Sequence, residues 1–211
     1  MLFDLDGVLV DSRTPFARSI NAALVAHGLP ARPEEELHPY LGPPLHATFA
    51  TLVGGRGEIV QSCVDAYRER YRAVGASESV VFEGIRECLL ELVRSTPCVV
   101  ATSKPRALAE PLLEAVGLRR FFEAVFGPSL EAEDEAKSVT VGRALQSLPS
   151  GTRAAIVGDR KFDISAGRDH GIATIGALWG IGSEAELREA GADHLAGAPS
   201  DLAALLGHRS Q

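Results

Sequence analysis

Two aspartates separated by one residue stand near the start of the chain, where a short apolar stretch meets a turn. Residues 1–5 predict a buried strand, and Asp6 and Gly7 predict the turn that ends it. Side chains alternate along an extended segment, so Asp4 and Asp6 are expected to point the same way. One carboxylate of such a pair can attack phosphorus while the other moves a proton. Acids that merely cap a turn give the same local pattern.

Similar polar side chains follow other apolar segments along the chain. Thr102 and Ser103 follow residues 98–101, and Asp159 follows residues 154–157, with Asp163 shortly after it. Ligands of open parallel sheets bind beyond the carboxyl ends of the strands, so these groups are expected to converge. Clustered carboxylates repel one another unless a cation joins them, and ligand sets of oxygen alone suit Mg²⁺. The sequence therefore predicts a magnesium site and a phosphorylated substrate.

Several further groups are candidates for holding the phosphoryl oxygens. The turn at Gly7 lets backbone N–H groups approach an anion, and Thr102 and Lys137 offer a hydroxyl and a cation. Lys104 is an alternative cation. Other roles stay open at this point: Thr102 and Asp159 are also suited to capping the helices that follow them, and Asp163 to an exposed helix position.

The order of predicted elements indicates an α/β protein with an inserted helical region. Residues 12–75 contain helical patterns broken at Gly/Pro clusters, with no strand candidate. Strands and helices alternate afterwards, which predicts a parallel sheet of about five strands with helices on both faces. We expect the sheet to be built from residues 1–12 and 78–211, and residues 13–77 to form an all-helical insert.

Composition excludes several classes of protein. The chain has 211 residues, 45% hydrophobic and 23% charged, with a net charge of -7. This profile predicts a globular protein and, without a basic patch, no binding to a nucleic-acid polymer. No apolar run is long enough for a bilayer span, and the three cysteines lack metal-ligand spacing. We expect a cytoplasmic protein, monomeric or homodimeric, that acts on a small phosphorylated metabolite.

Four segments, in order, resemble the motifs of the haloacid dehalogenase superfamily. They are FDLDGVLVDS at residues 3–12, VVATSKP at 99–105, Lys137 before a helix, and VGDRKFD at 157–163. LGPPL at residues 41–45, TSKP, and WGIGS at 179–183 are similar to the phosphoglycolate-phosphatase and 5′-nucleotidase-like branch. The chain departs from the usual pattern at two positions. Val8 stands where Thr is often found, and Ser138 stands where a Pro would follow the lysine of the third motif.

The resemblance implies a magnesium-dependent phosphatase with a Rossmann-like catalytic core, residues 1–12 and 78–211, and a helical cap domain, residues 13–77. Asp4 would be the nucleophile and a metal ligand, and Asp6 the acid/base, binding the metal through its main-chain carbonyl. Asp159 and Asp163 would complete the metal site. The residues expected around the phosphate and the substrate are Leu5, Gly7, Ser103, Lys104, Gly42, Pro43 and Pro44.

Two alternatives share this fold. A phosphomutase of the β-phosphoglucomutase type would pass the phosphoryl group to a sugar, although the GDxxxD form of the fourth motif is unusual there. A non-catalytic protein that binds a phosphorylated ligand would have no need of the paired acid at Asp6.

Overall fold

The computed structural model describes residues 1–132, 135–149 and 151–207, and the chain divides into two compact units. Unit 1 consists of Met1–Asp11 and the chain from Val81 onward, and unit 2 is Ser12–Val80. The end of the predicted core segment, residues 208–211, lies outside the described residues. Among the residues described, no helix is long and apolar enough to cross a bilayer.

Unit 1 is built on a six-stranded sheet in the order β5-β4-β1-β6-β7-β8, and neighbouring strands are parallel. Phe3 in β1 lies in register with Val100 on one side and Val157 on the other. The strands are β1 (Leu2–Phe3), β4 (Val99–Ala101), β5 (Ala124–Phe126), β6 (Ala155–Gly158), β7 (Ala173–Ala177) and β8 (His194–Ala196).

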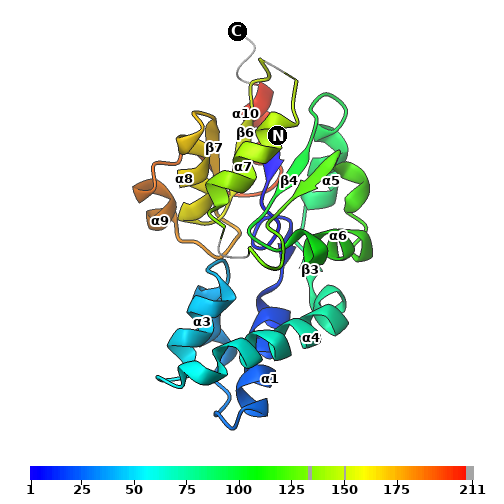
Figure 1. The fold of residues 1–211 in the computed structure, drawn as a ribbon. Coiled ribbons are helices and arrows are strands. Elements are labelled where there is room, and N and C mark those ends of the chain that lie inside the picture. The colour runs from blue at the N-terminus through cyan, green and yellow to red at the C-terminus, as the bar shows by residue number, and fades with distance from the viewer. Residues whose placement is uncertain (133–134, 150, 208–211) are drawn as a thin grey trace. The chain divides into compact units, whose positions relative to one another are not determined.

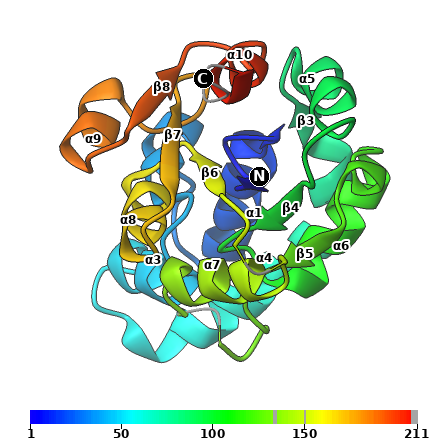
Figure 2. The same ribbon diagram turned by 90° about the horizontal axis from the view of Figure 1, so that it is seen from above.

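Helices cover both faces of this sheet (Figures 1 and 2). In Figure 2, α7 and α8 lie on one face, and α5 and α10 on the other. Leu2, Val99 and Ile156 from the sheet share a buried cluster with Val141 of α7 and Ala166 of α8. The helices are α5 (Ile85–Leu92), α6 (Arg106–Ala115), α7 (Lys137–Gln146), α8 (Lys161–Asp169), α9 (Glu184–Glu189) and α10 (Asp201–Gly207), with the 3₁₀ turn η3 (Arg119–Phe121).

The predicted parallel α/β fold is confirmed, with one more strand than the expected five. The additional strand is β8, which pairs with β7 through Gly176 and Leu195. It is three residues long and only Ala196 in it is fully buried. Such a short edge strand lacks the apolar run by which the other strands were predicted.

Unit 2 is helical and has its own aromatic core. Phe16 of α1 and Phe49 of α3 both contact the ring of Tyr67 in α4 edge-on, and Tyr67 stacks on Tyr71 at 5.5 Å. The bounds of the elements are α1 (Arg13–Ala26), α2 (Glu34–Leu37), η1 (His38–Tyr40), α3 (Leu45–Leu52), η2 (Gly57–Ile59) and α4 (Val60–Glu78). Where the chain leaves and re-enters unit 1, β2 (Val10–Asp11) and β3 (Val80–Val81) form a separate two-stranded sheet.

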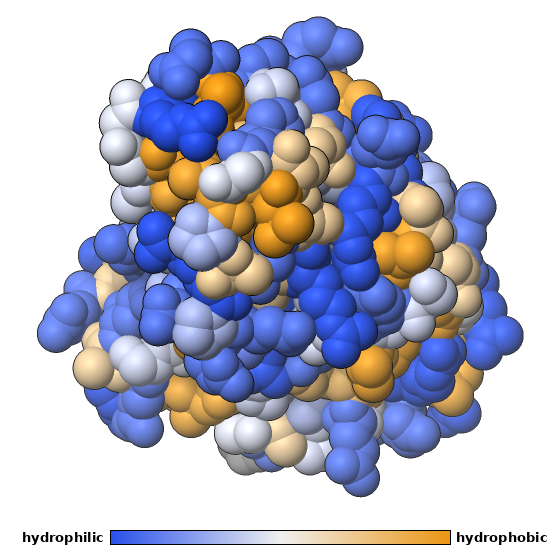
Figure 3. Space-filling view, turned by 90° about the horizontal axis from the view of Figure 1, so that it is seen from below, coloured by the Kyte–Doolittle hydropathy of each residue, from blue (hydrophilic) through white to orange (hydrophobic). Residues whose placement is uncertain are grey.

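Figure 3 shows one face, on which hydrophilic residues are interspersed with apolar patches of different sizes. Exposed large apolar side chains such as Val25, Leu90 and Val139 belong to different helices.

Candidate active site

The central strand of unit 1 places the first aspartate at the point where the order of the strands reverses. From β1 the chain proceeds to β4 and β5 on one side, and then returns to β6, β7 and β8 on the other. Crevices for ligands form at such switch points, outside the carboxyl ends of the strands. Asp4 follows β1 here, and its N–H donates to the Val157 carbonyl of β6 at 2.9 Å.

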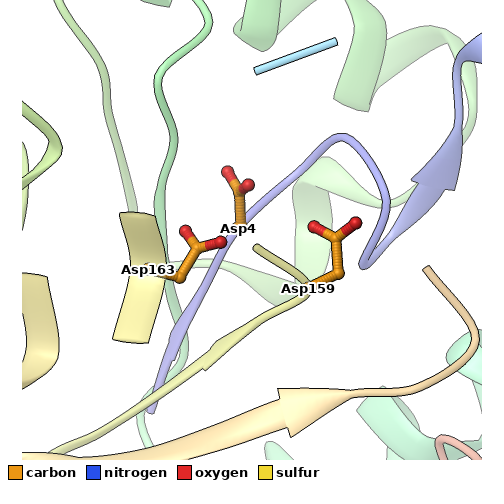
Figure 4. Close-up of side chains that lie close together, drawn as sticks. All are labelled: Asp4, Asp159 and Asp163. Atoms are coloured by element: carbon orange, nitrogen blue, oxygen red, sulfur yellow. The ribbon is translucent and has the colours of Figure 1, made fainter. Parts of the chain in front are cut away.

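Three carboxylates meet at this edge of the sheet. Asp4, Asp159 and Asp163 each offer an oxygen, and these oxygens lie within 4.8 Å of one another (Figure 4). We call these residues the acidic cluster. All three are buried, with 8%, 0% and 1% of their surfaces exposed. The burial of Asp163 excludes the exposed helix position considered above, and its Oδ2 instead accepts from the N–H of Arg160 at the start of α8.

One lysine contacts two members of the acidic cluster. Lys137, the first residue of α7, places its Nζ 2.7 Å from Asp4 Oδ1 and 2.8 Å from Asp163 Oδ1. Burial alone would lower the pKa of Lys137, but Asp163 and Asp4 raise it above its usual value. The lysine is therefore an ammonium ion, which balances one of the negative charges of the cluster.

The pKa values of Asp159 and Asp4 in the acidic cluster are raised above that of an ordinary aspartate. Burial, reinforced by Asp163 and Asp4, raises the pKa of Asp159 from 3.8 to about 8, despite a hydrogen bond from the N–H of Ile181. Burial also raises the pKa of Asp4 to about 6, although Lys137 opposes the shift. Without a cation, the cluster therefore binds protons at pH values where an ordinary aspartate is ionised.

The residues of the acidic cluster fit a hard divalent cation. Oδ1 of Asp159 is buried and has no hydrogen-bond partner among the described residues. A buried carboxylate oxygen without a donor is costly, and a cation removes that cost. The donors are carboxylate oxygens alone, which suits Mg²⁺ rather than a thiolate- or imidazole-binding metal.

Glycines allow the chain to approach Asp159 closely. Gly7 has a φ of 87°, and a Cβ there would overlap the carboxylate of Asp159. A Cβ on Gly180 or Gly182 would overlap other atoms of Asp159. Between those two glycines, the N–H of Ile181 donates to Asp159 Oδ2 at 2.7 Å. We did not predict these contacts; the only available signal was the glycine spacing in residues 179–183.

The neighbouring tryptophan supports the turn that carries Asp6. Trp179 Nε1 donates to the carbonyl of Val8 at 3.0 Å, which ties the loop after β7 to the turn after β1. Within that turn, the N–H groups of Leu9 and Val10 donate to the carbonyl of Leu5 at 3.0 and 3.1 Å.

Asp6 stands apart from the acidic cluster and is paired with a different lysine. Its Oδ2 lies 3.0 Å from Nζ of Lys104, which follows β4. The two lysines, which the sequence presented as rivals for one role, therefore contact different carboxylates. Thr102 is buried, and its Oγ1 accepts from the N–H of Lys104 at 3.1 Å. Ser103 is half-buried.

The predicted substrate contacts Gly42, Pro43 and Pro44 belong to unit 2. They form the loop between η1 and α3, where Gly42 has a φ of 112°. Their role stays a prediction.

Comparison with known proteins agrees with the fold. Residues 1–177 match the family of haloacid dehalogenase-like hydrolases. A 5′-nucleotidase from Pseudomonas aeruginosa is 36% identical over 207 residues, covering 97% of this chain and 92% of that protein. A phosphoglycolate phosphatase from Xanthomonas campestris is 29% identical, covering 85% and 83%.

One relative is named as a kinase rather than as a phosphatase or nucleotidase. The tyrosine-protein kinase PtkA from Mycobacterium tuberculosis is 35% identical over 185 residues, which cover 86% of this chain and 62% of that protein. Among solved structures, a haloacid dehalogenase-like hydrolase from Streptococcus pneumoniae has a TM-score of 0.90 and 31% identity, covering 97% of this chain and 96% of that one.

The chain belongs to the haloacid dehalogenase-like hydrolase family. Within it, the chain is an enzyme of the phosphatase class, a phosphoric monoester hydrolase. The resemblance read from the four sequence motifs is confirmed.

Proposed function

We propose that this enzyme is a magnesium-dependent phosphatase that hydrolyses a small phosphate monoester through an aspartyl-phosphate on Asp4. The observation that carries the proposal is the acidic cluster, in which three buried carboxylates face one ammonium group, Lys137. Two negative charges are left over, and a divalent cation would neutralise both.

The acidic cluster would hold the metal through Asp4, Asp159 and Asp163, together with the main-chain carbonyl of Asp6. When bound, Mg²⁺ would offset the negative charge of the substrate phosphate and of the carboxylates around it. A small phosphorylated metabolite would then be able to approach an acidic protein at this one edge.

The nucleophile in the proposed mechanism is Asp4. Lys137 orients the carboxylate of Asp4 through its contact with Oδ1, and burial excludes water from that carboxylate. Asp4 attacks the phosphorus atom, a bond forms between its oxygen and phosphorus, and the bond to the leaving oxygen breaks. Asp6 gives its proton to that leaving oxygen.

The second half of the reaction regenerates the enzyme. Asp6, now a carboxylate, takes a proton from a water molecule, and the resulting hydroxide attacks the phosphorus of the aspartyl-phosphate. Inorganic phosphate leaves and Asp4 is restored. Thr102, Ser103 and the N–H of Leu5 are the proposed partners of the phosphoryl oxygens, whereas the N–H of Gly7 donates to the carbonyl of Val10 at 2.9 Å, so Gly7 would shape the turn rather than supply a donor.

We propose that residues 13–77 select the leaving group, with Gly42, Pro43 and Pro44 among the contacts. The names of the relatives favour phosphoglycolate or a nucleoside monophosphate as the first substrates to test. We also propose a cytoplasmic enzyme that works as a monomer or homodimer.

The experiment that tests the proposal is a screen of phosphorylated metabolites with phosphate release as the readout, with and without EDTA. We expect turnover of at least one monoester that EDTA abolishes and Mg²⁺ restores. Turnover that survives exhaustive EDTA treatment would contradict the magnesium requirement, and no release from any substrate would favour the non-catalytic binding protein.

Transfer of the phosphoryl group to an acceptor other than water is the second candidate. It is favoured by the similarity to a protein named as a tyrosine kinase, and a phosphomutase would be another case. Hydrolysis predicts one phosphate released per leaving group, whereas transfer predicts less phosphate than leaving group when an acceptor is present.

A further inference from the structure

The ion pair between Lys104 and Asp6 is shielded from solvent. The side chain of Lys104 is 7% exposed and that of Asp6 13%, and their charged atoms lie 3.0 Å apart. Exposed ion pairs are weakened by water and salt and are easily exchanged for solvation. A pair covered to this degree holds its two side chains in one arrangement.

The backbone of Lys104 is fixed by its surroundings. Its N–H donates to Oγ1 of Thr102, and a Cβ on Gly127 would overlap its carbonyl oxygen, so the end of β5 packs directly against it. Two residues later, the N–H of Arg106 donates to the carbonyl of Pro128 at 3.0 Å. Lys104 therefore reaches Asp6 from a rigid base.

The backbone of Asp6 is equally constrained, because the turn closes on the carbonyl of Leu5 and on Trp179. With the backbone fixed, the direction of the carboxyl group depends on the rotation of the side chain. A group that transfers a proton must lie within hydrogen-bond reach of the reacting oxygen, and small errors in its position are costly. The contact with Lys104 restrains that rotation.

We propose that Lys104 is a positioning residue for Asp6, which holds the carboxyl group in the orientation for proton transfer to the leaving oxygen. The inference rests on the proposed function of Asp6. The proposal gives the two lysines different roles. Lys137 acts on the nucleophile Asp4 and on the phosphate, whereas Lys104 orients the acid Asp6.

The test compares two substrates that differ in their need for an acid. Phenyl phosphate and 4-nitrophenyl phosphate have similar size, but nitrophenolate leaves without protonation whereas phenolate, the base of an acid with a pKa of about 10, benefits from it. The constant to compare is kcat/KM, since it reports the steps up to departure of the leaving group and omits hydrolysis of the intermediate.

For Lys104→Met we expect kcat/KM for phenyl phosphate to fall about 10- to 100-fold, and that for 4-nitrophenyl phosphate by less than about threefold. Lys104→Arg should recover most of the difference. Arg106→Met removes a nearby exposed cation that pairs with Glu110, and should leave both values unchanged.

An equal loss of kcat/KM with both substrates in Lys104→Met, accompanied by weaker inhibition by inorganic phosphate, would overturn the inference and make Lys104 a phosphate ligand.

Asp6→Asn separates this inference from the function on which it rests. If Asp6→Asn shows the selective loss with phenyl phosphate and Lys104→Met does not, the positioning role alone fails. If Asp6→Asn shows no dependence on the leaving group, the acid role of Asp6 fails as well.

Discussion

The two groups of charged side chains in the active site differ in their balance. The acidic cluster of Asp4, Asp159 and Asp163 contains one lysine, which contacts only two of these carboxylates, whereas Asp6 has Lys104 at its side. The first group carries an excess of negative charge that burial makes costly, and the second does not. Of the two groups, only the acidic cluster has an excess of negative charge that a cation would balance, so we expect removal of metal to act there.

The largest effect is expected from Asp4→Asn, which removes the proposed nucleophile while leaving the size of the side chain unchanged. We expect kcat with 4-nitrophenyl phosphate to fall by at least about 1,000-fold. A steady-state assay measures this, and the exposed Asp65 of unit 2 offers the matched control Asp65→Asn, which should retain full activity.

Removal of the metal should have the next largest effect. Dialysis against EDTA is expected to lower kcat by more than about 100-fold, because the acidic cluster then repels the phosphate. Readdition of Mg²⁺ should restore the activity, and Asp159→Asn should raise the concentration needed for half restoration. Full restoration at the same concentration in Asp159→Asn would separate that residue from the metal.

Lys137→Met deepens the imbalance of the acidic cluster. Loss of the ammonium group leaves three buried carboxylates without a counter-charge, so we expect kcat/KM to fall about 100-fold with both aryl phosphates. This equal loss contrasts with the selective loss expected for Lys104→Met. A selective loss in Lys137→Met would erase the difference between the two lysines.

The smallest effect concerns stability without metal. The pKa of Asp159 is about 8 in the folded chain and 3.8 ordinarily, so between these values the folded state binds a proton that the unfolded state lacks. Stability of the metal-free protein should therefore fall as the pH rises from about 5 to 8. At pH 8, Asp159→Asn should raise Tm by about 2–8 °C, which a melting curve in EDTA measures.

The stability prediction has a direct control. Mg²⁺ should raise Tm of the wild-type protein more at pH 8 than at pH 5, since the carboxylates that bind it are ionised at the higher pH. A Tm of the metal-free protein that rises over this pH range would contradict the excess of negative charge.

The sequence predicted the parts of the active site that depend on topology. Asp4 and Asp159 each follow a strand, and parallel strands bring their carboxyl ends to one edge, so their proximity followed from the order of the elements. The parallel α/β fold followed from the same alternation. The roles of these residues remain predictions.

Contacts made by loops could not be predicted in this way. The N–H of Ile181 reaches Asp159 only because the loop after β7 folds back over the end of β6, and no periodic pattern encodes that path. The pairing of Lys104 with Asp6 likewise depends on side-chain rotamers within the packed site. The edge strand β8 was missed since its three residues carry no apolar run.

The central claim is that Asp4 carries the phosphoryl group, and chemical trapping tests it most directly. The enzyme is mixed with Mg²⁺ and 4-nitrophenyl phosphate, quenched within milliseconds, and reduced with borohydride, which converts an aspartyl-phosphate to homoserine. Peptide mass spectrometry should then find homoserine at residue 4 in Asp6→Asn, where the intermediate is expected to persist, and none in Asp4→Asn. Phosphate release without any homoserine at residue 4 would contradict the account.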